Sequence, residues 1–277
     1  NLADAFGMAN GKGINELGSG YDKDHPYVGR DPRFYITLGY DGSTFTVNDK
    51  TQTIETFEGG KDATATNKTA TKTGYYLKKL LSPQAVWDGR TNNITRTWIL
   101  MRYAEVLLNY AEAKFEKGGT GAEGFNQTVA DLTINKLRDR VGVAHMKVAE
   151  INAGFDPKRD QTVDPVLWEI RRERIVELMG EGFGFYDVRR WKKAPWFINK
   201  IQYGQCATKE QIGDSGQFVD LEKGYADTTG KKEGFIYMYN DPLVAGKGWL
   251  DKYYLYQVPT NEIALNPELA PNNPGWE

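Results

Sequence analysis

Charged side chains alternate with apolar ones along the segment Arg171–Trp191, which has the residue spacing of a helix. The pair Asp164-Pro165 precedes it, and Asp accepts hydrogen bonds from the first free amides of a helix while Pro suits the first helical position. Glu173, Glu177 and Glu181 recur every four residues, so their carboxyl groups share one face. Carboxyl groups at a suitable separation can act as general acid and base or as a glycosidase pair, which makes this face the first candidate for catalysis.

A structural interpretation of the same helix has stronger support. Leu167 and Leu178 fall on the face that also carries two arginines, so no side of the helix is purely polar. Glu173 and Glu177 each have an Arg within one turn. A buried carboxylate that pairs with Arg is held ionised and is not ready to exchange a proton. We therefore predict a network of ion pairs in the helical core, formed by Arg171, Glu173, Arg174, Glu177, Glu181 and Arg189 or Arg190.

Other kinds of catalytic or metal-binding site find little support in the sequence. The two histidines, His25 and His145, lie outside any nucleophile elbow or HExxH spacing. Cys206 is the only cysteine, which excludes an internal disulfide and a Cys-rich zinc site. No Gly-rich phosphate loop is flanked by the required strand and helix. We expect no catalytic residue, no metal and no cofactor.

The composition is that of a globular protein without a nucleic-acid partner. The chain has 277 residues, of which 40% are hydrophobic, enough for a core in one domain or in two closely packed ones. Its 35 basic and 37 acidic residues give a net charge of −2, which provides no field to hold a polyphosphate or an anionic membrane. No apolar run approaches the ~20 residues that a membrane-spanning helix needs.

The residue patterns predict a mainly helical fold with one small hairpin and long irregular loops. Apolar residues alternate with others over Phe34–Tyr40, Asp41-Gly42 forms a turn and the next residues return, so we expect a β-hairpin within residues 31–47. Residues 58–74 have almost nothing to bury and should form a solvated loop. After the charged helices of residues 164–192, the closing segment 195–277 should be rich in loops.

Within that closing segment, residues 254–258 have the pattern of a strand, and Thr260 should cap a helical turn that ends at Asn266-Pro267.

Two helices should form an antiparallel pair over residues 97–141. The first, from about residue 97 to 117, has two apolar lines, which predicts that it lies between two layers. Glycines at 118–121 end it. A second helix from about residue 124 to 141 then packs back against it through Ala130, Ile134, Leu137 and Val141.

Four motifs of the chain resemble those of one family in order and spacing. Asp31-Pro32-Arg33-Phe34 resembles the family's DPR motif, Leu100–Ala113 resembles its most recognisable helix, and Glu173–Trp191 resembles its signature helix. Val258–Trp276 resembles its closing pattern, in which an aromatic residue follows Asn-Pro-Gly. The family is SusD/RagB, the surface nutrient-binding lipoproteins of Bacteroidetes. The departures are small, at Phe183–Phe185 and at Asn272, where the family often has Gln.

The resemblance covers about the C-terminal half of a typical family member. Such proteins usually begin with a lipoprotein signal, an acylated Cys and a large half that contains tetratricopeptide-like helices, whereas this chain begins Asn1-Leu2-Ala3. We therefore expect a fragment, with a single SusD/RagB-like C-terminal domain over residues 1–277. Within it, the pair of helices at 97–141 resembles one tetratricopeptide hairpin.

The resemblance implies a non-catalytic receptor at the cell surface. It would bind an oligosaccharide or polysaccharide and hold it for a TonB-dependent transporter of the SusC type in the outer membrane. The protein's own N-terminal half would carry the lipid anchor and complete the binding surface. No nucleic acid is expected among the partners.

A sugar presents apolar C–H faces ringed by hydroxyl groups, so a matching site needs flat aromatic side chains with hydrogen-bonding groups at their edges. Aromatic residues make up 13% of the chain, and many lie in Gly- and Asn-rich loops, where packing onto the core is an equally good explanation. The candidate ligand-binding residues are Tyr21, Tyr27, Phe45, Tyr75, Tyr76, Trp87, Trp196 and Trp249.

Other functions stay open at this point. One is a secreted carbohydrate-active enzyme with the acidic helix as its site; the others are a peptide receptor and a purely structural lid on the transporter. Exposure of Glu173, Glu177 and Glu181 in a cleft would favour the enzyme, whereas salt bridges beneath packed helices would favour a binding protein.

Overall fold

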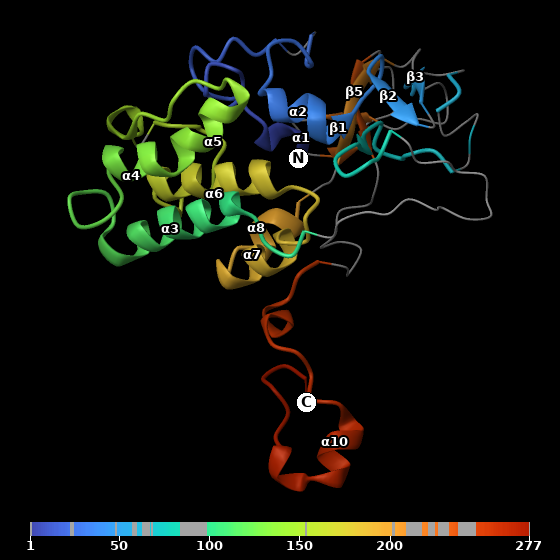
Figure 1. Ribbon diagram of the computed structural model, residues 1–277. Coiled ribbons are helices and arrows are strands. Elements are labelled where there is room, and N and C mark those ends of the chain that lie inside the picture. Colours follow the sequence, from blue (N-terminus) through green and yellow to red (C-terminus); the bar gives the residue numbers. More distant parts are fainter. Residues whose placement is uncertain are drawn as a thin grey trace.

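The computed structural model shows a mainly helical protein with small sheets at one side and an arm at the C-terminus (Figure 1). It describes residues 2–22, 25–47, 49–56, 60–62, 67, 69–83, 99–152, 154–200, 203–208, 218–220, 225–226, 233–237 and 248–276.

The main core lies between four helices on one side of the molecule (Figure 1). They are α3 (Tyr103–Gly118), α4 (Gln127–Leu132), α5 (Ile134–Val141) and α6 (Pro165–Leu178). Helix α3 packs against α6 and against both α4 and α5, so the antiparallel arrangement expected for residues 97–141 is present. The fully buried side chains of this core include Leu108, Ala111, Phe125, Ala130, Ile134 and Ile170.

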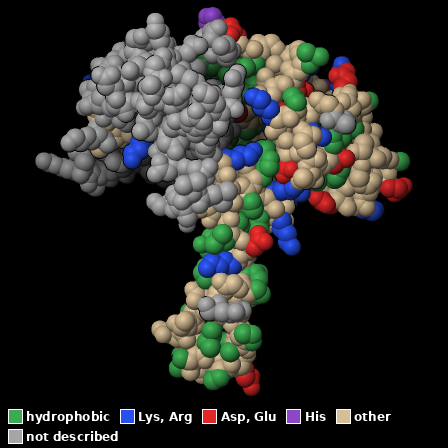
Figure 2. Space-filling model, turned by 180° about the vertical axis from the view of Figure 1, so that it is seen from behind, with side chains coloured by type: hydrophobic (Ala, Val, Ile, Leu, Met, Phe, Trp, Pro, Cys, Tyr) green, Lys and Arg blue, Asp and Glu red, His purple; other side chains and the backbone are tan. Residues whose placement is uncertain are grey.

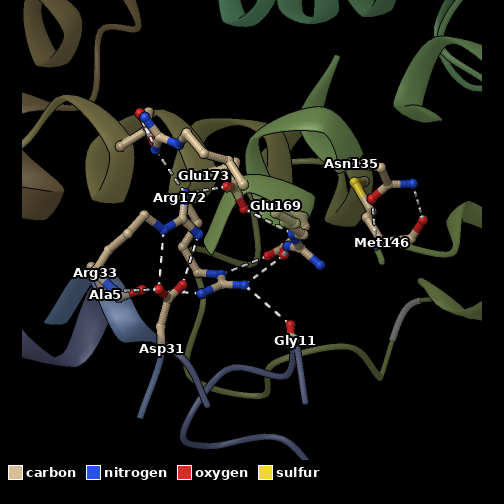
Figure 3. Close-up of polar contacts among 12 residues, drawn as sticks. Ala5, Gly11, Asp31, Arg33, Asn135, Met146, Glu169, Arg172 and Glu173 are labelled. Atoms are coloured by element: carbon tan, nitrogen blue, oxygen red, sulfur yellow. Dashed lines mark hydrogen bonds and ion pairs between the residues drawn. The ribbon is translucent and has the colours of Figure 1, made fainter. Parts of the chain in front are cut away.

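The second helix of the predicted pair is divided in two. Thr133 separates α4 from α5 with φ −125° and ψ −88°, and its hydroxyl donates to the carbonyl of Val129 at 2.5 Å. Asn126 caps α4 by accepting from the amide of Val129 at 3.1 Å. Just after the break, the buried Asn135 accepts from the amide of Met146 at 2.7 Å and donates to its carbonyl at 3.1 Å (Figure 3). The break therefore lets one buried amide tie α5 to the following loop, which contains η1 (Val148–Glu150).

The prediction that the first helix lies between two layers was wrong for the described part of the chain. One apolar line of α3 is buried, but Tyr103, Val106 and Tyr110 on the other line are exposed. Residues 99–101, just before the helix, are exposed as well. One face of α3 thus carries an uncovered apolar stripe.

The predicted strand at Phe34–Tyr40 is mostly a helix, α2 (Pro32–Thr37). Asp31 caps it by accepting from the amide of Arg33 at 2.9 Å, and Pro32 stands at its first turn. Only β1 (Leu38–Gly39) is extended, and it pairs with the distant β4 (Tyr76–Leu77). The helix start predicted by Asp31-Pro32 therefore outweighs the strand predicted by the short alternation of apolar residues.

The hairpin of this region is also displaced. Strand β2 (Thr44–Val47) pairs in antiparallel register with β3 (Lys50–Thr53), not with the residues before Asp41-Gly42. The predicted hairpin over 31–47 was therefore wrong, and a hairpin lies over 44–53 instead.

A second, smaller core contains the first residues of the chain. Phe6 and Phe34 are fully buried, α1 (Leu2–Ala5) contacts α6, and Leu38 and Val176 complete the buried set. Half-buried tyrosines surround it: Tyr27, Tyr35, Tyr40 and Tyr75.

The end of the predicted loop at 58–74 is packed. The amide of Gln205 donates to the carbonyl of Thr73 at 2.7 Å, and Ala70 is buried. A Cβ on Gly74 would lie 2.3 Å from Gln205 Cδ. The prediction of a solvated loop was therefore wrong for its last residues.

Strands within 195–252 were not predicted. Strand β5 (Tyr203–Thr208), which contains Gln205, joins a four-stranded sheet of order β5-β8-β6-β7 with β6 (Phe218–Asp220), β7 (Tyr225–Ala226) and β8 (Glu233–Tyr237).

The closing residues form an arm that extends away from the body (Figure 1). It contains η2 (Asp251–Tyr254), α10 (Thr260–Leu265) and η3 (Pro267–Leu269). The predicted strand at 254–258 is absent, whereas the helical turn before Asn266-Pro267 is confirmed, although Thr260 makes no side-chain cap. Hydrophobic side chains lie along the arm's surface (Figure 2), among them the exposed Leu255, Tyr256 and Leu265.

Candidate functional site

The carboxylate of Glu173 lies at the centre of the buried charges on α6. Arg33 Nη1 contacts its Oε1 at 2.5 Å, and Arg138 Nε contacts its Oε2 at 3.0 Å. Arg33 is held in turn by both carboxylate oxygens of Asp31, so the residues of the DPR motif brace α6 (Figure 3). Burial alone would raise the pKa of Glu173, but the charges of Arg33 and Arg138 outweigh burial and lower this pKa to about 2.

A second pair of arginines holds the start of α6. The carboxylate of Glu169 accepts from Arg138 at 2.5 Å and from Arg172 at 2.6 Å. Arg172 also donates to the carbonyls of Ala5 and Gly11, which ties α6 to the N-terminal segment (Figure 3). Arg138 and Arg172 share the carboxylate of Glu169. This carboxylate does not face solvent, because the Glu169 side chain is buried.

Three cations surround the carboxylate of Glu177. Its oxygens lie 3.1 Å from Arg33, 2.6 Å from Arg102 and 2.8 Å from Arg140. Glu181, one turn further, is bound by Arg102 at 2.7 Å and by a lysine. Burial opposes ionisation of Glu181, but the hydrogen bonds from Arg102 and Lys79 lower its pKa.

The end of the predicted network connects α3, α6 and α7 (Gly184–Arg190). Arg174 bonds to Asp187 at 2.8 Å, and Arg190 bonds to both Asp187 and the buried Glu112 of α3. Arg171 lies 3.6 Å from Glu112. The Arg189 guanidinium instead donates to the carbonyl of Tyr254 and covers the ring of Tyr256.

The predicted residues other than Arg189 all form ion pairs, but the prediction that they pair with one another was wrong, because every partner comes from outside the predicted set. Glu173 and Glu177 pair mainly with arginines from distant segments and not with those one turn away on α6. These carboxylates lie beneath packed helices and carry compensated charges. Such a group is poorly suited to proton transfer near neutral pH, so the arrangement favours the structural interpretation.

Two residues of the first predicted aromatic cluster, Tyr27 and Tyr75, pack against the N-terminal core. Tyr27 stacks on Tyr40 with a centroid distance of 4.2 Å and on Phe34 at 6.1 Å. Tyr75 packs edge-on against Tyr27 at 6.3 Å, and its burial raises the pKa of its hydroxyl. Tyr21 lies under the guanidinium of Arg30. These rings pack around α2 and do not form an open platform for a sugar.

The other members of that first cluster lie elsewhere. Phe45 is half-buried in β2, and Tyr76 in β4 accepts a hydrogen bond from the amide of Thr71 at 3.3 Å. Within the described residues, no ring contact joins either of them to Tyr27. Trp87 lies outside the described residues. The structure therefore does not bring the first cluster together as one surface.

Trp196, from the second predicted group, packs inward. It lies in α8 (Ala194–Ile198) with its ring 4.8 Å from Trp168 of α6 and 4.7 Å from Phe197. The ammonium of Lys200 lies 3.1 Å from the ring centroid. This packing against Trp168 and Phe197 leaves Trp249 as the remaining candidate of the group.

Trp249 belongs to a continuous aromatic surface at the base of the arm. Its ring lies 6.3 Å from Phe185 of α7, 5.8 Å from Tyr253 and 5.2 Å from Tyr254. Asn199 fixes the Trp249 backbone through its amide and carbonyl. We call this set the α7–η2 aromatic surface; its members are Phe185, Tyr186, Trp249, Tyr253, Tyr254, Tyr256 and Trp276.

Three rings of this surface are open to solvent, and Phe185, at 48%, is the least exposed of them. Tyr186 is 66% exposed and Tyr256 is 67% exposed. Polar groups lie around them: Asn273 donates to the carbonyl of Tyr256, and the Arg189 guanidinium covers its ring at 4.3 Å. Flat rings bordered by amide and guanidinium groups are suited to the C–H faces and hydroxyl groups of a sugar.

The SusD family model matches residues 1–276 of the chain. The chain belongs to the SusD family. It is also similar to solved structures from Bacteroides fragilis. One is a SusD-like protein with a TM-score of 0.65 and 24% identity, and the match covers 99% of this chain and 46% of that protein. Another is a SusD-like carbohydrate binding protein with a TM-score of 0.63 and 24% identity, with coverage of 97% and 47%.

This SusD-family chain therefore spans about half the length of these solved relatives. Comparison with the curated proteins gave no significant match.

The family motifs have clear structural roles in this SusD-family chain. Asp31-Pro32-Arg33 caps α2 and neutralises Glu173, and Arg102 neutralises Glu177 and Glu181 just before α3. At the end, the side chain of Asn272 bonds to both backbone groups of Val258, which closes the arm on itself. The short amide of Asn272 therefore bridges two segments of the arm.

The sequence analysis missed most of the α7–η2 aromatic surface. Its signals were present in the Phe185-Tyr186 pair and in the run Tyr253–Tyr256, but these lay in segments assigned to a helix and a strand. Among the described residues, no group of three or more His, Cys, Asp or Glu could hold a metal ion. No described helix is long and apolar enough to span a membrane.

Proposed function

We propose that this chain is the glycan-binding part of a non-catalytic, cell-surface SusD-type receptor. The observation that carries the proposal is the family match over residues 1–276. A solved relative that shares the fold is a SusD-like carbohydrate binding protein. The proposed ligand is an oligosaccharide or polysaccharide, held for uptake and released unchanged.

The proposed contact region is the α7–η2 aromatic surface. Tyr186 and Tyr256 offer exposed rings, and the Trp249 ring packs against Phe185, which in turn packs against Tyr186. Stacking of one sugar on one ring contributes roughly 1–3 kcal/mol, by analogy with other ring stacking. The side chain of Asn273 lies at the edge, where it can reach sugar hydroxyl groups.

The buried charges of α6 support binding over hydrolysis. A glycosidase needs one carboxyl group that is protonated near its working pH and a second that is ionised beside it. The pKa of Glu173 is instead lowered to about 2, because Arg33 and Arg138 outweigh its burial, and the pKa of Glu181 is lowered as well. The acidic helix is therefore assigned to the frame of the protein.

We further propose a SusC-like TonB-dependent transporter as the membrane partner and the outer membrane as the location. The chain matches less than half of each solved relative, so the rest of such a protein is proposed to complete the binding surface and to carry the anchor. The uncovered apolar stripe on α3, formed by Tyr103, Val106 and Tyr110, supports a further helical layer at that face.

A glycan array tests the proposal. This chain and the full-length product of its gene would be applied in parallel, and bound glycans would be incubated with each protein and analysed for cleavage. We expect selective retention of one glycan class by the full-length product, weaker retention by this chain, and recovery of the glycan intact. Turnover of the glycan would contradict the receptor, and retention of no glycan by the full-length product would contradict glycan binding.

A further inference from the structure

Arg159 is a buried arginine that has no carboxylate partner in the part of the chain that the structure describes. Its residue is 7% exposed, and its Nε–H has no hydrogen-bond partner among the described residues. Only the side-chain oxygen of Gln161 accepts from its guanidinium, through Nη1. A buried charge without a partner is costly, and proteins normally pair such a group.

The other buried arginines of the helical core do not share this state. Arg33, Arg138, Arg172 and Arg174 each bind at least one carboxylate. Arg171, whose Nε also lacks a hydrogen bond, still lies 3.6 Å from the carboxylate of Glu112. Arg30, a further buried arginine, donates to the backbone carbonyls of Ala3, Phe6, Gly7 and Pro26. The Arg159 guanidinium has fewer partners among the described residues, so an incoming anion would gain more there.

Arg159 forms part of the wall of a cavity at the start of α6. The cavity has a volume of about 460 Å³. This volume lies within the range of small-molecule sites, roughly 300–1,000 Å³. Its wall combines apolar side chains, Ile151, Val163 and Pro165, with polar ones, Thr120, Asn152, Gln161 and Thr162.

The acidic groups near the cavity are already committed. Asp160 pairs with Lys193 at 2.9 Å and accepts from the Thr162 hydroxyl at 2.6 Å. Burial opposes ionisation of Asp160, but these hydrogen bonds lower its pKa. Asp164, which lines the cavity, uses Oδ1 to cap α6 at 2.8 Å and 3.3 Å. Neither carboxylate neutralises Arg159.

We propose that this cavity binds the carboxylated sugar of an acidic saccharide, such as a uronic acid. The sugar carboxylate would accept from the guanidinium of Arg159. The hydroxyl groups would bond to Asn152 and Thr120 and donate to the second oxygen of Asp164. Ile151 and Pro165 would contact the apolar C–H face of the ring. This inference rests on the proposed glycan-binding function and narrows its ligand class to acidic glycans.

The test uses calorimetry with matched probes on the full-length product. The probes are short oligomers of galacturonate, of glucuronate and of N-acetylneuraminate, each beside its neutral methyl ester. We expect at least one acid to bind about 10-fold to 100-fold more tightly than its ester, as a charge-assisted hydrogen bond provides. Arg159→Gln should remove this preference, whereas Lys136→Gln, which removes an exposed charge from α5, should keep it.

A second pair of variants acts at the rim of the cavity and leaves Arg159 in place. Thr120 is exposed, so Thr120→Glu and Thr120→Gln differ in charge but hardly in shape. The Glu variant should bind the acid several-fold more weakly than the Gln variant and bind the ester equally well. In the absence of ligand, Arg159→Gln should melt no lower than the native chain, since it removes an uncompensated buried charge.

Several results would overturn the inference. Equal affinity for every acid and its ester, or an unchanged preference in Arg159→Gln, would remove the cavity as an acid site. A fall of several degrees in the melting temperature of Arg159→Gln would make Arg159 a structural residue. Binding of a pentaglutamate peptide with the same dependence on Arg159 would replace the saccharide by a peptide. Binding of neutral glycans without any preference for acids would contradict this inference and leave the proposed receptor function standing.

Discussion

Replacing Glu173 by Gln removes the central charge of the buried network and leaves its shape nearly unchanged. The carboxylate lies 2.5 Å from Arg33 and 3.0 Å from Arg138, and its side chain is 1% exposed. Lowering its pKa from 4.5 to about 2 by these two charges, against the opposing effect of burial, corresponds to roughly 3 kcal/mol of stability. Breaking one side of a buried pair typically costs about 3–5 kcal/mol. Asp31 and Glu169 still hold the two arginines, so we expect the lower end of that range.

Thermal denaturation at pH 7 gives the first readout. For a chain of this size, each kcal/mol shifts the melting temperature by roughly 2–4 °C, so Glu173→Gln should lower it by roughly 6–12 °C. Glu123→Gln is the matched control, because Glu123 is exposed and its replacement removes the same charge. Its melting temperature should stay within about 1 °C of the native chain.

The pH dependence gives the second readout. The pKa of Glu173 is lower in the folded chain than in the unfolded one, so its stabilisation is complete above about pH 4.5 and is lost as the pH falls towards 2. The difference between the native chain and Glu173→Gln should therefore shrink over this interval. A melting temperature that moves by no more than the Glu123→Gln control, or a difference independent of pH, would refute the network as a source of stability.

Other predictions concern the same frame. Glu177→Ala should destabilise the chain by about 3–5 kcal/mol in urea denaturation, because it leaves Arg33, Arg102 and Arg140 facing one another. Gly74→Ala should lower the melting temperature more than Gly42→Ala: both glycines have positive φ, but only a Cβ at Gly74 collides with Gln205; equal effects would show that Gln205 moves aside freely. Asn135→Leu should cost about 1–3 kcal/mol, since the buried amide of Met146 loses its acceptor while the Met146 carbonyl keeps its hydrogen bond from Gln127, and a neutral result would contradict that role. Tyr27→Ala should cost about 3 kcal/mol through lost packing, whereas an unchanged stability with lost glycan affinity would return Tyr27 to the binding site.

The sequence predicted the helical frame well where periodicity and capping agreed. Asp164-Pro165 caps α6 as expected, and Ala130, Ile134 and Leu137 of the predicted contact line lie in the core, whereas Val141 is only half-buried. The paired state of the acidic helix was also predictable, because charges inside an apolar pattern need partners. The identity of the partners was not, since Arg33, Arg102 and Arg138 approach from segments far away in the sequence.

The errors have physical causes. Over Phe34–Tyr40, a short apolar alternation predicts a strand, whereas the Asp-Pro pair before it predicts the start of a helix. The segment is helical because Asp31 caps the helix and Phe34 is buried. The two apolar lines of α3 predicted burial on both sides, but one line is exposed in this chain. Loop aromatics could not be assigned from the sequence, because a tyrosine that packs on a core and one that meets a ligand have the same local pattern. Tyr27 and Tyr186 differ in the residues that the fold places against their rings.

The most direct test of the receptor is titration of a glycan retained on the array against two matched variants of the full-length product. In one, Tyr186 and Tyr256 of the α7–η2 aromatic surface are replaced together by Ala; in the other, Leu17 of the N-terminal segment is replaced. Leu17 is 96% exposed, so its side chain buries little apolar surface. We predict that the double variant loses at least about 10-fold in affinity, that Leu17→Ala binds as the native protein does, and that the glycan is recovered uncleaved. Equal affinity in all three proteins would contradict the aromatic surface as the binding site.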